Sequence, residues 1–136
     1  MKKRIIFLFS IMLSIGILAA CGSDEKQNDK EEGQVPQMLE VKVKTDPGEL
    51  SAGKTTQVSA IVTQGEEKVS DADEVLFEIW KEGVSEEDHI KKEAELKEDG
   101  IYAIDYTFDE KGKYFIIAHV TARDLHNMPK VEVNVQ

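Results

Sequence analysis

The chain of 136 residues carries 27 acidic and 17 basic side chains, for a formal net charge of -10, and a single cysteine. This length suits one domain with a leader and a linker. An acidic protein repels nucleic acid and gains no electrostatic attraction to anionic lipid, so we exclude nucleic-acid binding. One cysteine cannot form an intramolecular disulfide, so the core must hold without one.

Residues 1–20 have the organisation of a secretory signal peptide. Basic residues at positions 2–4 precede an apolar run over 5–17, and small residues follow before Cys21. The run is short for a spanning helix, which needs about 20 apolar residues. We predict that this segment is removed, which makes the mature chain three charges more negative.

Residues 18–21 read Leu-Ala-Ala-Cys and resemble a bacterial lipobox. The resemblance implies cleavage before Cys21 and a diacylglycerol on its thiol, because a thiolate is the nucleophile that accepts the lipid. Two acyl chains anchor a protein stably, whereas one chain binds only marginally. We expect a lipoprotein on the extracytoplasmic face of the cell membrane. The alternative is an uncleaved N-terminal anchor helix with Cys21 incidental.

A polar, acidic segment covers residues 21–36 and begins with Cys21, the cysteine expected to be lipidated. Val35 is its only aliphatic residue, and no hydrophobic periodicity is visible. Such a segment cannot bury enough apolar surface to offset its ordering entropy. We predict a flexible tether, with a coil reach of roughly 20–25 Å.

From residue 37 to the end, the hydrophobic period is two, which is typical of strands. Turn residues separate the apolar runs at regular intervals, and this pattern predicts an all-β, immunoglobulin-like antiparallel sandwich over 37–136. The seven expected strands cover 39–44, 55–63, 75–81, 89–97, 101–108, 112–123 and 129–135.

The segment 89–97 is the most ambiguous of these, because its Lys, Glu, Ala and Leu residues also favour a helix. We prefer a strand, since the turn 98–100 and the plainly β segment 101–108 follow. A three-residue loop with Gly100 in the left-handed conformation suits a bulged hairpin. That hairpin would place on one face Ala94, Leu96, Tyr102 and Ile104.

Tyr114 stands where a tyrosine corner would, near the start of the sixth strand, with its phenol bonded to backbone upstream. If Tyr114 points inward, alternate residues of this strand and of 75–81 point outward. The large apolar members of this outward set are Leu76, Trp80, Phe115 and Ile117. A contiguous exposed apolar patch often marks a contact surface. The alternative is a second small core under a loop or under Val35.

His126 and Met128 share a face if the segment before Pro129 is extended. Both then lie outward, and His119 lies opposite or diagonal to Met128 across the final hairpin. Imidazole and thioether form a soft ligand set that suits Cu(I). We therefore expect His119, His126 and Met128 to be metal ligands, with Trp80 bordering the site; the alternative is that these residues are structural.

The remaining motifs do not indicate a ligand-binding or catalytic site. The acidic runs 70–74 and 85–88 lack the spaced glycine of a calcium loop, so we interpret them as solvated loops. The sequence shows no recognisable Ser/His/Asp arrangement and no phosphate-binding loop. We interpret His89 most simply as a loop residue. We predict that the protein is not an enzyme.

Several motifs together resemble those of the YtkA-like/FixH-like bacterial lipoproteins. These motifs are Gly112-x-Tyr114, His119-Val120, His126-x-Met128-Pro129, the closing Val-x-Val-x-Val and the earlier Val-x-Phe-x-Ile-Trp. The resemblance covers about the last 100 residues. It implies a non-catalytic extracytoplasmic β-sandwich, and its FixH side implies copper supply or assembly of cytochrome oxidase. FixH proteins carry an uncleaved membrane helix where this chain has a lipobox.

Two functions follow as hypotheses. In the first, a lipid-anchored binding module handles copper through His119, His126 and Met128. In the second, an interaction or structural module uses the patch around Trp80 to meet a membrane or envelope protein.

Overall fold

The computed structural model describes residues 35–136. The predicted signal peptide, Cys21 and nearly all of the tether lie outside the described residues. Within this part of the chain, no helix has the length and apolarity needed to cross a membrane. Residues Pro36–Gln136 form one compact unit. All residues of the hydrophobic core lie within this range.

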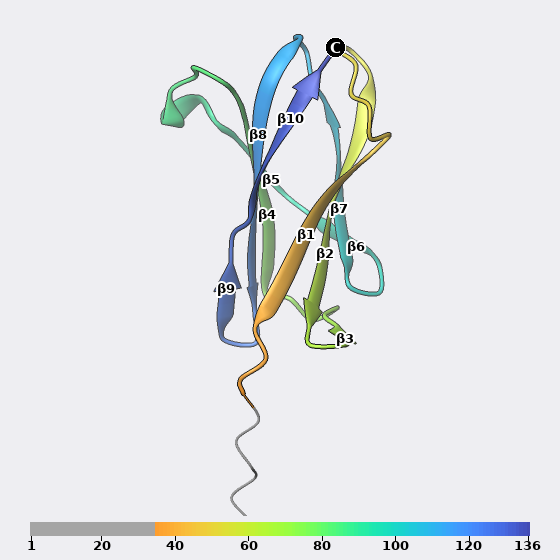
Figure 1. Ribbon diagram of the computed structural model, residues 1–136, viewed down its shortest axis with the longest axis vertical. Helices are drawn as coiled ribbons and strands as arrows, with labels where there is room; N and C mark the ends of the chain where they lie inside the picture. The colour runs from red at the N-terminus through yellow and green to blue at the C-terminus, as the bar shows by residue number, and fades with distance from the viewer. Residues whose placement is uncertain (1–34) are drawn as a thin grey trace, which may run out of the picture. The chain divides into compact units, whose positions relative to one another are not determined.

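Two antiparallel sheets face each other in this unit (Figure 1). The first, sheet A, has the order β1 (Leu39–Asp46), β2 (Thr55–Gln64), β7 (Ile101–Thr107) and β6 (Glu95–Glu98), with β3 (Glu67–Lys68) beside β2. The second, sheet B, has the order β10 (Lys130–Val135), β8 (Gly112–Ala122), β4 (Glu74–Lys81) and β5 (Ile90–Glu93), with β9 (Leu125–Asn127) beside β8. This is the immunoglobulin strand order with one strand added next to β4. The predicted sandwich is confirmed.

The alternation expected from the sequence appears as alternating burial. Along β8, every second side chain from Tyr114 to Ala122 is buried and the intervening side chains are partly exposed. The core between the sheets contains Phe77, Ile79 and Ile116, all with no exposed surface. Burying such side chains stabilises a fold by about 1.5–3 kcal/mol each.

The tyrosine corner is also confirmed. The Tyr114 hydroxyl donates to the carbonyl oxygen of Glu110 at 3.0 Å. Its ring meets Phe108 edge to face, with centroids 4.9 Å apart. The contact joins the start of β8 in sheet B to the loop that leaves β7 in sheet A.

The prediction of one strand over 89–97 is wrong. The segment forms β5 on sheet B and β6 on sheet A, so the chain changes sheets at Ala94. The Ala94 N–H donates a hydrogen bond to the Val75 carbonyl oxygen at 2.8 Å. Polar and charged side chains dominate both halves, so each half can serve as a sheet edge. Leu96 pairs with Tyr102 as expected, but on an edge strand it remains 47% exposed and does not join the core.

The described part of the chain holds ten strands where seven were predicted. Besides the divided segment, the additions are β3, two residues long, and β9, three residues long. Such short strands carry too few residues to show a period. The 3₁₀ helix η1 (Glu86–Asp88) precedes β5.

The two ends of the described chain lie at opposite ends of the sandwich (Figure 1). Where the chain enters, the Asn127 side chain donates to the Leu39 carbonyl at 2.7 Å, which ties β1 to β9. At the other end, Leu50 and Val135 form a parallel bridge beside the C-terminus. Both sheets are therefore linked at each end.

Candidate functional site

The outer face of sheet B carries the predicted site residues. Strands β4 and β8 pair in register, so their outward side chains form rows across the sheet. Along the face the paired residues are Leu76–His119, Glu78–Ile117 and Trp80–Phe115. The predicted outward orientation of all six is confirmed by the burial of their neighbours on both strands.

Glu78 is the centre of a polar cluster that the sequence did not reveal. One carboxylate oxygen lies 2.7 Å from Nδ1 of His89, and the other lies 2.8 Å from Nε2 of His119. Glu78 is only 8% exposed. The hydrogen bond from His89 lowers the pKa of Glu78 most, the bond from His119 lowers it further, and burial opposes both effects. Glu78 is therefore an anion with two imidazole partners.

His89 was expected to be a simple loop residue; it does lie in the loop between η1 and β5, but its contacts were not expected. It follows η1, and its side chain is only 10% exposed. Its ring stacks on Trp80 with centroids 4.2 Å apart and an interplanar angle of 8°. Trp80 in turn lies 5.4 Å from Phe115. The loop before β5 thus folds over the outer face of β4 and covers Trp80.

His119 and His126 lie together near one end of this face. Their ring centroids are 6.2 Å apart. His126 pairs with Thr121 across the β8–β9 hairpin, and its Nδ1 lies 2.9 Å from the Thr121 hydroxyl. The structure therefore brings together two histidines that are seven positions apart in sequence.

Met128 lies across the same hairpin from His119. The register is fixed on either side of it by the pairs Val120–Asn127 and Ile117–Lys130. Met128 is 50% exposed. The predicted proximity of His119 and Met128 is thus present in the strand register. Trp80 does not border them, because it lies two rows along β4 from Leu76, the partner of His119.

The donor set suits a soft ion. Within residues 35–136, no group of three or more His, Cys, Asp or Glu side chains is arranged to hold a metal. The predicted set contains two histidines and a thioether. Each imidazole has one nitrogen bonded to a neighbour, Glu78 or Thr121, while its other nitrogen has no hydrogen-bond partner in the described chain. Metal-ligating histidines are typically held in this way.

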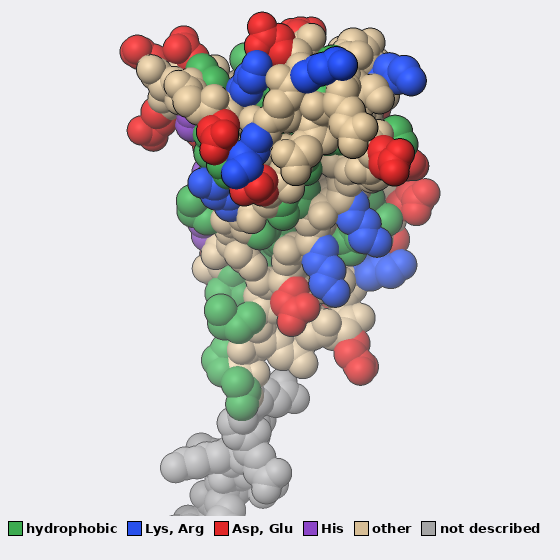
Figure 2. All heavy atoms as spheres, turned by 45° about the horizontal axis from the view of Figure 1, so that its top comes forward, with side chains coloured by type: hydrophobic (Ala, Val, Ile, Leu, Met, Phe, Trp, Pro, Cys, Tyr) green, Lys and Arg blue, Asp and Glu red, His purple; other side chains and the backbone are tan. Residues whose placement is uncertain are grey.

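The apolar patch is partly covered. Leu76, Trp80, Phe115 and Ile117 are all intermediate in exposure. Besides His89, the Lys130 ammonium covers this surface, 5.2 Å from the Trp80 ring centroid and 4.4 Å from that of Phe115. Val35 is 82% exposed and covers nothing. Figure 2 shows histidine side chains at one edge of the molecule, with hydrophobic, basic and acidic side chains beside them.

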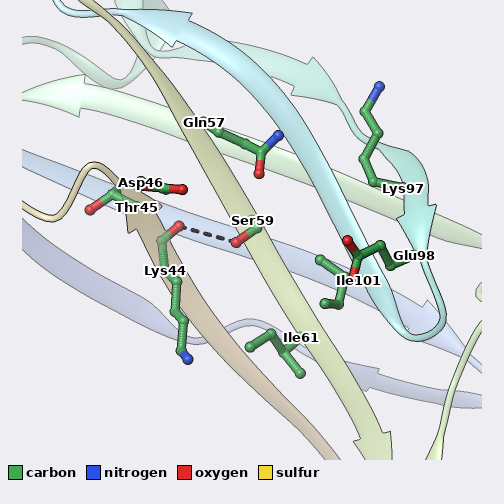
Figure 3. Close-up of a pocket in the computed structure, with 9 residues that line it drawn as sticks. All are labelled: Lys44, Thr45, Asp46, Gln57, Ser59, Ile61, Lys97, Glu98 and Ile101. Atoms are coloured by element: carbon green, nitrogen blue, oxygen red, sulfur yellow. Dashed lines mark hydrogen bonds between the residues drawn. The ribbon is translucent and has the colours of Figure 1, made fainter.

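A hollow of about 500 Å³ lies on the outer face of sheet A (Figure 3). Lys44 and Lys97 lie on opposite sides of it, and Ser59 lies between them with its hydroxyl 3.5 Å from the Lys44 carbonyl. Asp46 and Glu98 add the opposite charge. None of these side chains is fully buried, and their charges offset one another, so the hollow selects no evident ligand.

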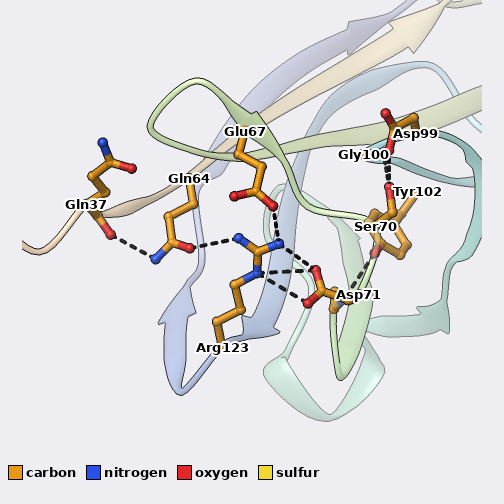
Figure 4. A network of polar contacts seen from close by, with 10 residues as sticks. Gln37, Gln64, Glu67, Ser70, Asp71, Asp99, Gly100, Tyr102 and Arg123 are labelled. Atoms are coloured by element: carbon orange, nitrogen blue, oxygen red, sulfur yellow. Dashed lines mark hydrogen bonds and ion pairs between the residues drawn. The ribbon is translucent and has the colours of Figure 1, made fainter.

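A second polar network joins the two sheets near the β8–β9 turn (Figure 4). Arg123 donates to Asp71 at 3.0 Å, Glu67 at 2.9 Å and Gln64 at 3.0 Å. The guanidinium lowers the pKa of Asp71, and the two carboxylates raise the pKa of Arg123. Arg123 and Asp124 both have positive φ, as a two-residue hairpin turn of type I′ requires. The network holds this turn in place.

Comparison with known protein families bears on most of the domain. No curated protein matches the chain. A family model described as YtkA-like matches residues 33–119, which is more than half of the chain. The match ends at His119, so His126 and Met128 lie beyond it. The chain therefore belongs to the YtkA-like family.

Proposed function

We propose that this protein is a lipid-anchored, extracytoplasmic Cu(I)-binding module. The observation that supports this function is the grouping of His119, His126 and Met128 at one end of the outer face of sheet B. Imidazole and thioether donors favour Cu(I), whereas hard cations prefer oxygen ligands. We propose binding without catalysis.

Copper would be a cargo in this function. The site lies on an outer face, and Met128 is half exposed, so the ion could be taken up and released without opening the core. The resemblance to FixH-like proteins favours a role in copper supply or oxidase assembly. The predicted lipid on Cys21 would keep the domain at the membrane where such a partner is found.

Titration of Cu(I) into residues 22–136 against a competing chelator tests the proposal. These residues include the whole compact unit and its core. We expect one ion per chain and a loss of affinity of at least tenfold in His119→Ala, His126→Ala and Met128→Ala. Met38→Ala is the matched control, because Met38 is 73% exposed and outside the set. Unchanged binding in all three site variants would overturn the proposal.

The anchor has its own test, since it depends on residues outside the described part of the chain. Cells expressing the full chain are labelled with radioactive palmitate. We expect the label on the wild-type protein and none on Cys21→Ser. Label that persists on Cys21→Ser would contradict lipidation of Cys21, and a wild-type protein without label would favour the uncleaved anchor helix.

A second candidate function rests on the surface around Trp80. Trp80, Phe115 and Lys130 combine aromatic area with a cation, and aromatic side chains are enriched in protein interfaces. In this function the domain meets a membrane or envelope protein and the histidines are structural. A photo-crosslinker at position 80 of the anchored protein should then capture one partner. The interface is excluded if the same partner is captured from Lys44 on the opposite sheet.

A further inference from the structure

We infer that Glu78 is a positioning residue for the proposed site, which fixes the tautomer of His119 so that Nδ1 faces the ion. The consequence for copper rests on the proposed function. The tautomer itself does not, because it follows from hydrogen bonds within the metal-free protein.

The proton positions follow from what a carboxylate can do. Glutamate is ionised at neutral pH, and an ionised carboxylate only accepts hydrogen bonds. Its two oxygens contact Nε2 of His119 and Nδ1 of His89. Both of these nitrogens must therefore carry a hydrogen. A neutral His119 then has its lone pair on Nδ1, the nitrogen that has no hydrogen-bond partner within residues 35–136.

The carboxylate is held in place from its other side. His89 occupies the second oxygen, and its ring is stacked on Trp80 with nearly parallel planes. Glu78 and His89 are almost fully covered, at 8% and 10% exposure. Turning the carboxylate away from His119 would therefore also break the bond to His89. Through this chain of contacts, the loop that carries His89 helps to orient a ligand on another strand.

His89 itself is not proposed as a ligand. Its Nδ1 is committed to Glu78 and its ring face to Trp80. Its function is to hold the carboxylate, in the way that outer partners of metal-binding histidines orient the ligands and raise their basicity. Loss of such a partner typically lowers metal affinity about 10–100-fold.

Glu78→Gln is the informative substitution, because it preserves shape. A glutamine amide has one acceptor oxygen and one donor nitrogen, so it cannot accept from both histidines. At least one imidazole must change tautomer or lose its hydrogen bond. Glu132→Gln is the matched control, since it removes the same charge from the same sheet face at a residue bonded to Lys113.

The first measurement needs no variant and no metal. Long-range ¹H–¹⁵N NMR of residues 22–136 at about pH 8.5, above the usual pKa of histidine, reports which ring nitrogen is protonated. We expect Nε2–H for His119 and Nδ1–H for His89, the second of which an unconstrained imidazole seldom adopts. An Nδ1–H form of His119 would overturn the inference even if no variant folds.

The second measurement is Cu(I) affinity by chelator competition. We expect a loss of about 10–100-fold in Glu78→Gln and no loss in Glu132→Gln. Wild-type affinity in Glu78→Gln would overturn the positioning role. The two proposals fail separately: unchanged binding in all three of His119→Ala, His126→Ala and Met128→Ala refutes the copper site, whereas the tautomers of the metal-free protein test Glu78 alone.

Discussion

The two outer faces of this sandwich have the same strand geometry and very different organisation. On sheet B, Glu78 lies among apolar and aromatic neighbours, is nearly covered, and holds two histidines. On sheet A, the centre of the face is occupied by small or polar residues such as Ser59, and Lys44 and Lys97 lie at the rim of a shallow hollow.

The difference arises from what lies over each face. The loop after β4 folds back over sheet B through His89, so that face has a second layer of contacts. Within the described chain, the hollow on sheet A has no comparable cover. A polar group under a cover must be bonded or it costs stability, whereas an exposed one is satisfied by water. The covered face is therefore the one that can hold side chains in a fixed geometry.

The largest expected effect is a difference in stability between two variants, each of which truncates one outward side chain to alanine, one on sheet B and one on sheet A. Trp80→Ala should cost about 2–3 kcal/mol of unfolding free energy, somewhat less than for a fully buried tryptophan, because His89, Phe115 and Lys130 all lose contacts. Ile61→Ala on sheet A should cost about 1 kcal/mol. Urea denaturation of residues 22–136 measures both. Equal losses would show that the cover over sheet B adds no stability.

A smaller effect is expected where the two sheets are joined. Tyr114→Phe removes the hydrogen bond to the Glu110 carbonyl and should cost about 1 kcal/mol. Tyr106→Phe is the control, because the Tyr106 hydroxyl makes no hydrogen bond within the described residues. If the two variants lose the same stability in urea, the tyrosine corner does not contribute to joining the sheets.

The smallest effect concerns the network around Arg123, because the carboxylates of Glu67 and Asp71 in this network are exposed to solvent. Hydrogen bonding to Arg123 lowers the pKa of Asp71 in the folded state. The resulting stability is fully present above the unfolded pKa of about 3.9 and is lost as the pH falls through the lower folded value. The melting temperature of the wild type should thus exceed that of Asp71→Asn near neutral pH.

That difference in melting temperature should shrink below about pH 4. Asp73→Asn is a control in the same loop, because Asp73 makes no ion pair within residues 35–136. A difference between wild type and Asp71→Asn that stays constant from neutral to acid pH would contradict the assigned ion pair.

Much of the fold could be predicted from the sequence, because β8 and its neighbours alternate apolar and polar residues over a long span. The same alternation correctly placed His119 and Phe115 on the outer face. The alternation did not show that the segment 89–97 forms two strands. Both halves are rich in charged residues, so each half could pair with either sheet. Which sheet each half joins is decided by tertiary packing, which no local period records.

The site was only half predictable. His119, His126 and Met128 lie on one face of one hairpin, so local register was enough to bring them together. Glu78 and His89 were missed, because an outward acidic residue and a loop histidine both suggest solvent exposure. One signal was present: Glu78 is the only charged residue within the run 75–80, which is otherwise apolar. A lone charge in such a run indicates a buried partner.

The opposite placement of the two chain ends has a mechanical consequence. The chain enters the domain beside β9 and ends beside Leu50, at the far end of β1 and β10 (Figure 1). Tension applied between the two ends of the described chain would act along these strands. Antiparallel hydrogen bonds lie perpendicular to the strands, so many of them would be loaded together in shear. A domain pulled from these two ends should resist force better than one whose strands are peeled apart one bond at a time.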